Sequence, residues 1–209
     1  MSQNYVLRSA VQLHCKGTAV PDIDDKPGVI ELLDRYEKWR RIFSYSGKAP
    51  PDIPDSEGGR LYFRRGYPHP DWSAYVLERT PDDDYRVLHA TTERLQTPVE
   101  SSEGRFSRIQ DAGKFIIYKT ATSLMISCWM DPLSWKWHDA GLDPRVDARI
   151  ESDRVVKYVL RSDPDAYCIM SLGDMPYSHI LPLSYDELDA LLLEDFPESV
   201  TSQLAAESR

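Results

Sequence analysis

The side chains best able to do chemistry are dispersed along this sequence. No two histidines are spaced as H-x-x-x-H or H-E-x-x-H, which argues against a zinc site. The five histidines are His14, His69, His89, His138 and His179. Cys168 and His179 fall in segments predicted to be neighbouring strands, so a thiol could lie near an imidazole. Nothing near either residue supplies an oxyanion site, and the sequence therefore predicts no catalytic residue.

Sequence motifs for phosphate or cofactor binding are absent too. The chain contains no G-x-x-x-x-G-K-[ST], no G-x-G-x-x-G and no G-x-S-x-G, the patterns of phosphate loops, dinucleotide sites and nucleophile elbows. We expect no cofactor, no metal and no enzymatic activity.

Two short segments could instead contact a protein. Asp82, Asp83 and Asp84 sit at the tip of a predicted hairpin, where they form either a solvated turn or a negative projection that enters a basic cleft. Trp135, Trp137 and His138 lie in a predicted loop. These rings either cover one face of the sheet or, if exposed, anchor an interface. These six residues are the candidate partner-binding residues.

Composition narrows the class of partner. The 209 residues carry a formal net charge of −9, and 41% of them are hydrophobic, which suits a soluble globular protein. An acidic surface repels nucleic-acid phosphates and anionic membranes, so we expect neither as a partner. The three cysteines are far apart and the N-terminus lacks a signal-peptide pattern, so we expect a reducing cytoplasm.

The elements that must position these residues are predicted from periodicity. Apolar residues recur every three or four positions from Pro27 to Tyr45 and predict an amphipathic helix, with Gly47 as its C-cap. Residues 60–90 contain three aromatic and aliphatic runs separated by Gly, Pro and Asp, which is typical of an antiparallel meander. The Ser184-Tyr185-Asp186-Glu187 sequence is a capping box that begins a helix over 184–196.

The remaining segments are assigned in the same way. Residues 91–104 are predicted as a surface loop and 129–153 as a connection. Residues 106–130 fit a helix over most of their length, although 115–118 and 124–126 would also suit strands. Three further strands are predicted at 154–161, 166–171 and 177–181.

The predicted fold class is α+β: a single domain with a mostly antiparallel sheet of six or seven strands and helices packed on it. Residues 1–26 are expected to form an N-terminal extension or edge segment. Residues 27–197 are expected to form the α+β domain, and 198–209 a flexible tail.

The order of these features resembles a known family over residues 33–196. The resemblance rests on a helix with Trp39 that ends at Phe43-Ser44-Tyr45-Ser46-Gly47, and on an arginine-rich strand at 60–64. It continues with Trp72 before a strand that ends in Glu78-Arg79, an Asp-containing turn at 162–165, and Leu183-Ser184 before a helix. In this order the chain is similar to bacterial immunity proteins of the tuberculosis necrotizing toxin antitoxin type.

The chain departs from that pattern in its N-terminal extension, in its longer 129–153 connection, and at 114–118, where Lys-Phe-Ile-Ile-Tyr replaces a Glu-x-Tyr-Leu signature. The resemblance implies a non-catalytic antitoxin. Such a protein would bind a secreted, NAD-hydrolysing toxin domain one to one and block its substrate cleft. The alternative is a non-catalytic α+β interaction domain, such as a secretion chaperone or regulator.

Overall fold

The first helix, α1, spans Pro27–Tyr45, as its periodicity predicts. We describe the chain from a computed structural model that covers residues 27–92 and 97–207, so the predicted extension at 1–26 lies outside the described residues. Tyr36, Trp39 and Phe43 are buried on one face of α1. Gly47, with φ of +67°, ends the helix, and Lys48 N–H donates to the Phe43 carbonyl at 2.9 Å, which completes a Schellman cap.

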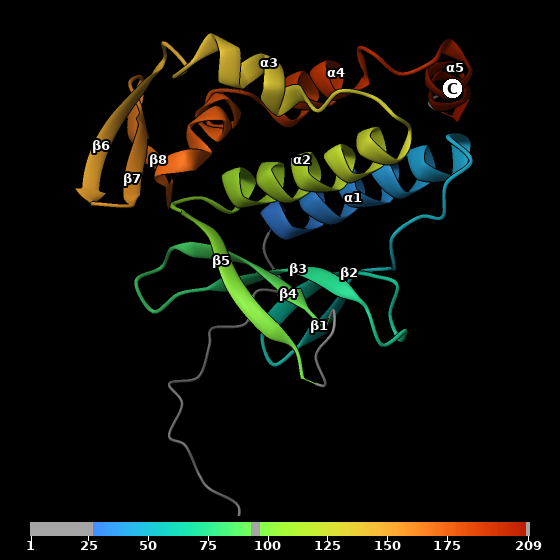
Figure 1. Ribbon diagram of the computed structural model, residues 1–209, viewed down its shortest axis with the longest axis horizontal. Helices are drawn as coiled ribbons and strands as arrows, with labels where there is room; N and C mark the ends of the chain where they lie inside the picture. The colour runs from blue at the N-terminus through green and yellow to red at the C-terminus, as the bar shows by residue number, and fades with distance from the viewer. Residues whose placement is uncertain (1–26, 93–96, 208–209) are drawn as a thin grey trace, which may run out of the picture.

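The described strands form one antiparallel sheet of eight, in the order β1-β2-β3-β4-β5-β8-β7-β6. Their bounds are β1 Asp55–Glu57, β2 Arg60–Arg65, β3 Ser73–Arg79, β4 Tyr85–Thr91, β5 Val99–Phe106, β6 Val146–Ser152, β7 Val155–Leu160 and β8 Asp163–Ser171. The α+β class and the meander of β2, β3 and β4 are confirmed. Only Arg105 and Phe106 of β5 pair with β8, so β6–β8 stand at one end of the molecule (Figure 1).

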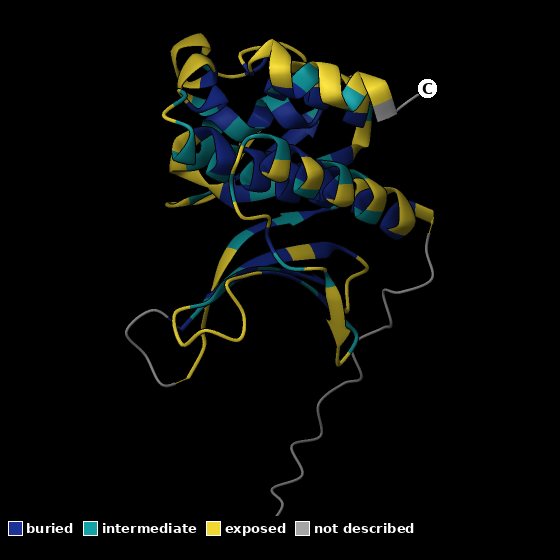
Figure 2. Ribbon diagram, turned by 90° about the vertical axis from the view of Figure 1, so that its right-hand side faces the viewer, coloured by how far each residue is buried: buried dark blue, intermediate teal, exposed yellow. Residues whose placement is uncertain are grey.

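Helix α2, Ile109–Ser127, lies between β1–β5 and an upper layer of short helices (Figure 1). The helical alternative for 106–130 is therefore the correct one. The helices are dark blue where they face the core and yellow on their outer sides, whereas β3 and β4 are mostly buried or intermediate along their length (Figure 2). Buried Lys114 donates from Nζ to the Ile180, Leu181 and Leu183 carbonyls at 3.0, 3.1 and 2.6 Å and pairs with Asp111 at 2.8 Å. These bonds fix α2 to the segment 180–183.

Helix α4, Tyr185–Leu193, begins at the predicted capping box. The Glu187 N–H donates to Ser184 Oγ at 3.2 Å, and the Ser184 N–H donates to Glu187 Oε2 at 2.7 Å. Asp189 of this helix is buried and accepts from Trp39 Nε1 at 2.8 Å and from Lys38 Nζ at 2.7 Å. Arg35 adds a third contact at 3.2 Å. This shared carboxylate joins α4 to α1.

Two segments predicted without regular structure contain strands. Residues 91–104, expected to be a loop, contribute β5. The 129–153 connection contains the helix α3, Leu133–Ala140, and the edge strand β6. The first half of β5 and nearly all of β6 are exposed, so their side chains need not be apolar. Polar strands of this kind carry no alternating hydrophobic signal.

Two further predictions are wrong. Residues 177–181 were expected to be a strand, but 177–180 belong to the 3₁₀ helix η1, Leu172–Ile180, which contains Pro176, and Leu181 is its C-cap. A proline cannot donate to a sheet ladder. Residues 198–209, expected to be a flexible tail, contribute the helix α5, Glu198–Glu207. This helix begins after Pro197 and buries Val200 against the core.

Candidate partner-binding surface

Helix α3 points its two tryptophans in different directions. A step of two residues turns an α-helix by about 200°, so side chains at i and i+2 face apart. Trp137 is 7% exposed and stacks on Tyr118, with ring centres 5.3 Å apart. Trp135 is 60% exposed. Only Trp135 of this pair is available to a partner, and Trp137 acts as the lid that the sequence allowed. His138 is exposed beside it.

His179, a residue of η1, connects that helix to α3. The His179 ring stacks on Trp137 at 5.5 Å, its Nε2 lies 2.7 Å from the Gly141 carbonyl, and its Nδ1 lies 3.3 Å from Asp143. Burial acts to raise the pKa of Asp143, but hydrogen bonds from Arg145 outweigh it and lower the pKa below its ordinary value. His179 is thus a structural contact, on η1 and not on a strand beside Cys168. Burial raises the pKa of the Cys168 thiol, which makes it a poor nucleophile.

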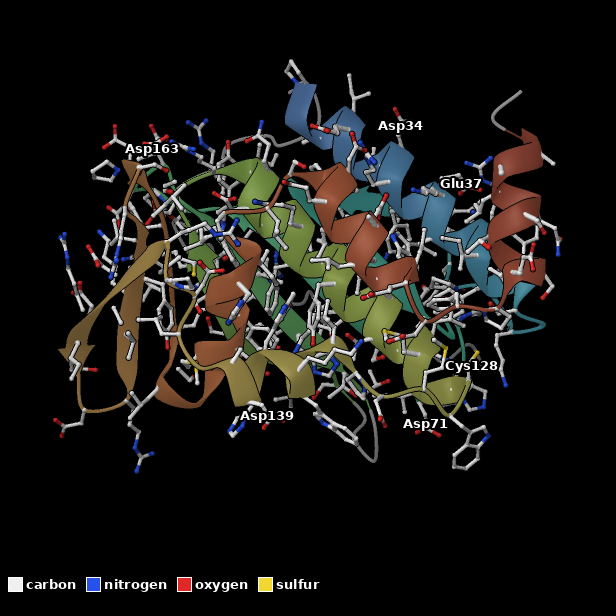
Figure 3. All side chains as sticks on the ribbon, turned by 90° about the horizontal axis from the view of Figure 1, so that it is seen from above. Asp34, Glu37, Asp71, Cys128, Asp139 and Asp163 are labelled. Atoms are coloured by element: carbon white, nitrogen blue, oxygen red, sulfur yellow. The ribbon has the colours of Figure 1, made fainter. Side chains whose placement is uncertain are left out.

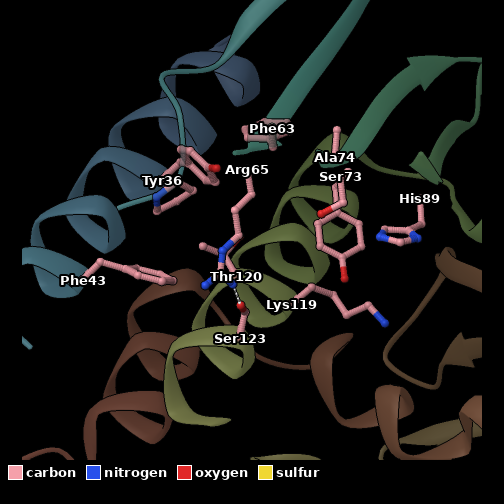
Figure 4. A pocket seen from close by; sticks show the side chains of 12 residues that line it. Tyr36, Phe43, Phe63, Arg65, Ser73, Ala74, His89, Lys119, Thr120 and Ser123 are labelled. Carbon is pink, nitrogen blue, oxygen red and sulfur yellow. Dashed lines mark hydrogen bonds between the residues drawn. The ribbon is translucent and has the colours of Figure 1, made fainter. Parts of the chain in front are cut away.

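Beneath α3, two adjoining cavities form what we name the Arg65–Lys119 cleft. The outer cavity holds about 620 Å³ and is lined by Arg65, Tyr75, Lys119, Trp135 and Tyr177 among others. The inner one holds about 110 Å³, reaches His89, and shares Arg65, Tyr75 and Lys119 with the outer. In Figure 4, Arg65 reaches from β2 across the inner cavity to Ser123 on α2, and Lys119 leaves α2 in another direction.

Lys119 is a permanent cation in this cleft. Its Nζ pairs with Glu103 at 2.8 Å and lies 5.3 Å from the ring centre of Tyr177 and 5.8 Å from that of Tyr75. Burial acts to lower the pKa of Lys119, but Tyr75, Tyr177 and Glu103 outweigh it and the net shift is upward. The ammonium therefore stays charged at neutral pH.

Arg65 is a cation without a carboxylate partner among the described residues. Its guanidinium donates to Ser123 Oγ and lies 5.8 Å from the ring centre of Phe43. The other arginines of β2 and β3 are matched: Arg60 with Glu78 and Glu100, Arg64 with Asp55 and Glu57, and Arg79 with Asp83. The end of β2 thus presents an unneutralised positive charge in a chain of net charge −9.

Three exposed hydrophobic side chains come from the end of α2 and from α3, and we call them the α2–α3 surface. Ile126 is 58%, Trp129 95% and Trp135 60% exposed. Ile126 and Trp135 also line the outer cavity, so these two side chains connect the surface to the cleft. In Figure 3, the labels Cys128 and Asp139 mark the residues near the C-terminal ends of α2 and α3.

The backbone at Trp129 is unusual for its residue type. Met130 N–H donates to the Met125 carbonyl at 2.9 Å and Trp129 N–H to that of Ile126 at 3.1 Å. These are the two bonds of a Schellman cap, in which Trp129, with φ of +60°, takes the left-handed position that glycine normally fills. Trp129 was not among the candidate residues predicted from the sequence. The sequence does hold one indication of its role: a tryptophan stands where the predicted helix ends, at a position where glycine is usual.

The acidic tip does not join this surface. Asp82 and Asp83 are exposed in the turn between β3 and β4, but Asp84 is 5% exposed and accepts a hydrogen bond from the Tyr167 hydroxyl at 2.8 Å. Arg105 pairs with Asp84 at 3.1 Å. The tip is at the Arg79 end of β3, whereas the cleft is at the Ser73 end. At roughly 3.3 Å per residue, the two ends are about 20 Å apart.

Within the described residues, no group of His, Cys, Asp and Glu side chains is arranged to hold a metal ion. In the same part of the chain, no helix is both long enough and apolar enough to cross a membrane.

Comparison with known proteins gives one structural similarity. No known protein family and no curated protein matches this chain. Among solved structures, the chain is similar to Rv3902c from M. tuberculosis, with a TM-score of 0.48 and 13% sequence identity over 74% of this chain and 87% of that one. A similarity of this extent assigns no function.

Proposed function

We propose that this protein is an immunity protein that binds a cognate toxin domain in the cytoplasm and blocks its active site before export. The toxin domain is expected to hydrolyse NAD. The observation that carries the proposal is the α2–α3 surface, where a tryptophan 95% exposed occupies a backbone position that favours glycine. Exposed aromatic side chains of this kind dominate the energy of protein interfaces.

The sequence resemblance supports the choice of an immunity protein over other binding proteins. Trp39 lies in α1 at the core, Trp72 directly precedes β3, and Ser184 begins α4 with its capping box. The order of elements on which the resemblance rests is therefore compatible with this fold. As an inhibitor, the protein would supply no catalytic group and would act stoichiometrically.

The experiment uses the C-terminal domain of the secreted protein encoded beside this chain. The two are mixed, the complex is sized by light scattering, and NAD hydrolysis is followed with increasing amounts of this protein. We expect a 1:1 complex and complete inhibition at one equivalent. A neighbouring domain that hydrolyses NAD equally fast with excess protein present would contradict the proposal.

The second candidate is a secretion chaperone or regulator. The same exposed surface would serve it. The α2–α3 surface supports binding to a protein but does not distinguish an inhibitor from a chaperone. The same mixture distinguishes the two: a chaperone forms the complex but leaves hydrolysis of NAD intact.

A further inference from the structure

The geometry points to the Arg65–Lys119 cleft as a receptor for an acidic segment of the partner protein, with the α2–α3 surface gripping the apolar residues beside it. This inference rests on the proposed function and adds the location of the interface and the chemistry of the segment it accepts. The sequence predicted that Asp82, Asp83 and Asp84 of this protein enter a basic cleft of the partner. The inference is the opposite: an acidic segment of the partner enters a basic cleft of this protein.

The first support is charge. Arg65 is the last residue of β2. Among the described residues its side chain has no carboxylate partner, and its guanidinium donates to the neutral Ser123 hydroxyl. Exchanging the hydroxyl for a carboxylate turns a single bond to a neutral acceptor into a bidentate ion pair. Lys119 lies in the same cleft, but Glu103 already pairs with it at 2.8 Å, so the unpaired charge of the cleft is that of Arg65. An incoming carboxylate thus meets a cationic site on an otherwise acidic protein.

The second support is the shape and composition of the walls. The outer cavity of about 620 Å³ has the size of a pocket that accepts several side chains. Ser123, Ser127 and Ser134 provide hydroxyl groups, and Tyr75 and Tyr177 provide aromatic surface. Such walls suit a peptide that carries both polar and apolar groups.

The third support is the apolar surface at the mouth. Ile126 and Trp135 line the cavity and are themselves more than half exposed. Trp129 lies two residues beyond the end of α2 and is 95% exposed. A free small anion could use Arg65 but would leave these three side chains uncovered. A second copy of this chain would bring another net charge of −9, which repels. An acidic protein segment flanked by apolar residues uses both features.

The test compares matched charge reversals in the complex with the neighbouring toxin domain. Arg65→Glu removes the cation at the cleft, and Arg149→Glu makes the same change at an exposed position on the edge strand β6. We expect Arg65→Glu to weaken binding by about 30-fold or more, as for a close interfacial charge pair, and Arg149→Glu by less than about threefold. Arg65→Met, which keeps the aliphatic stem, should fall between the two. Equal affinities for Arg65→Glu and Arg149→Glu would overturn the inference.

A second measurement does not depend on the toxin. Synthetic hexapeptides that differ only in a central Glu, Gln or Lys between Phe and Leu are immobilised and probed with the parent protein and with Arg65→Glu. We expect the parent to prefer the Glu peptide and the variant to lose that preference. Failure of NAD inhibition with the peptide preference intact would remove the proposed function and retain the cleft.

Three further results would overturn the inference about the cleft. The first is equal retention of the Glu and Lys peptides by the parent protein. The second is displacement of the Glu peptide by millimolar inorganic phosphate, with binding unaffected by Trp135→Ala, which would indicate a small-anion site. The third is a parent dimer that Arg65→Glu converts to monomer, which would make a second copy the occupant.

Discussion

Trp39 and Trp129 lie at the two extremes of exposure in this molecule. Trp39 has 0% of its surface exposed, and its Nε1 donates to Asp189. Trp129 is 95% exposed and follows a helix with a φ of +60°. The region between α1 and α4 satisfies its charges and buries its rings. Near the end of α2, Trp129 is exposed, and Arg65 of β2 contacts Ser123 of α2 with no carboxylate partner among the described residues.

This difference separates two uses of the same side chain. Burying Trp39 stabilises the fold through apolar contact and one satisfied hydrogen bond. Exposing Trp129 contributes almost nothing to the fold and places a non-glycine residue in the left-handed region, at an expense of about 1 kcal/mol or more. Regions that oppose stability in this way are frequently functional. The predictions below test whether the two regions divide stability and binding as we propose.

The largest expected effect is on stability at the buried region. Trp39→Ala should lower the free energy of unfolding by about 3–5 kcal/mol, because it deletes a large buried ring and leaves a cavity. Trp39→Phe should cost less, since it keeps much of the ring and loses mainly the bond to Asp189. Denaturant midpoints measure both. If Trp39→Ala and Trp129→Ala shift the midpoint equally, the contrast between the two regions is wrong.

The close packing of α2 against α4 gives the next effect. A Cβ at Gly113 would lie 2.0 Å from the Tyr185 hydroxyl, so Gly113→Ala should destabilise by about 1–3 kcal/mol through overpacking. The Tyr185 hydroxyl has no hydrogen-bond partner in the described part of the chain, so Tyr185→Phe alone should be nearly neutral. Combined with Tyr185→Phe, Gly113→Ala should cost less than it does alone. Additive losses in the double variant would show that the contact is not the cause.

Whether an element can be predicted from the sequence depends on whether it buries a regular pattern of apolar side chains. The stripe in α1, the glycine at 47 and the capping box at Ser184 are local signals, and all three are confirmed. Strands β5 and β6 were missed because most of their exposed residues are polar. The tryptophans were visible in the sequence. Whether Trp135 or Trp137 faces solvent depends on the contact between Trp137 and Tyr118, which are far apart in sequence.

The unmatched arginine is the feature that the sequence could least reveal. Arg65 follows Arg64 directly, and the two differ only in which residues the folded chain brings near them. Arg64 meets Asp55 and Glu57 from β1, whereas Arg65 meets Ser123 from α2. Partners of this kind come from tertiary structure alone, and for that reason the sequence pointed to the acidic tip in place of the basic cleft.

A smaller effect is expected at the start of α4. Ser184→Ala should lower the free energy of unfolding by about 1 kcal/mol at pH 7, because one N-cap bond is lost. Bonds from the Ser184 backbone N–H and hydroxyl lower the pKa of Glu187 below its ordinary 4.5. The folded-state pKa is depressed, so this stabilisation is present above pH 4.5 and is lost as the pH falls through the folded pKa. Unfolding curves at pH 7 and pH 3 should show a smaller penalty for Ser184→Ala at the lower pH. An unchanged penalty would indicate that the Glu187 half of the capping box does not contribute.

The smallest effect on stability, and the most informative about function, is expected at Trp129. Trp129→Gly should be between neutral and about 1 kcal/mol more stable than the parent, because glycine relieves the left-handed backbone while its freedom in the unfolded chain offsets part of the gain. Trp129→Ala keeps the strain and loses little buried surface, so it should be less stable than Trp129→Gly. Both variants should bind the toxin domain at least about tenfold more weakly, as expected for an interface anchor. If Trp129→Gly is more stable than the parent and binds the toxin domain more weakly, Trp129 contributes to binding at the expense of stability. Trp129→Gly that binds as tightly as the parent would exclude the tryptophan as an anchor and leave its exposed, left-handed position without a function.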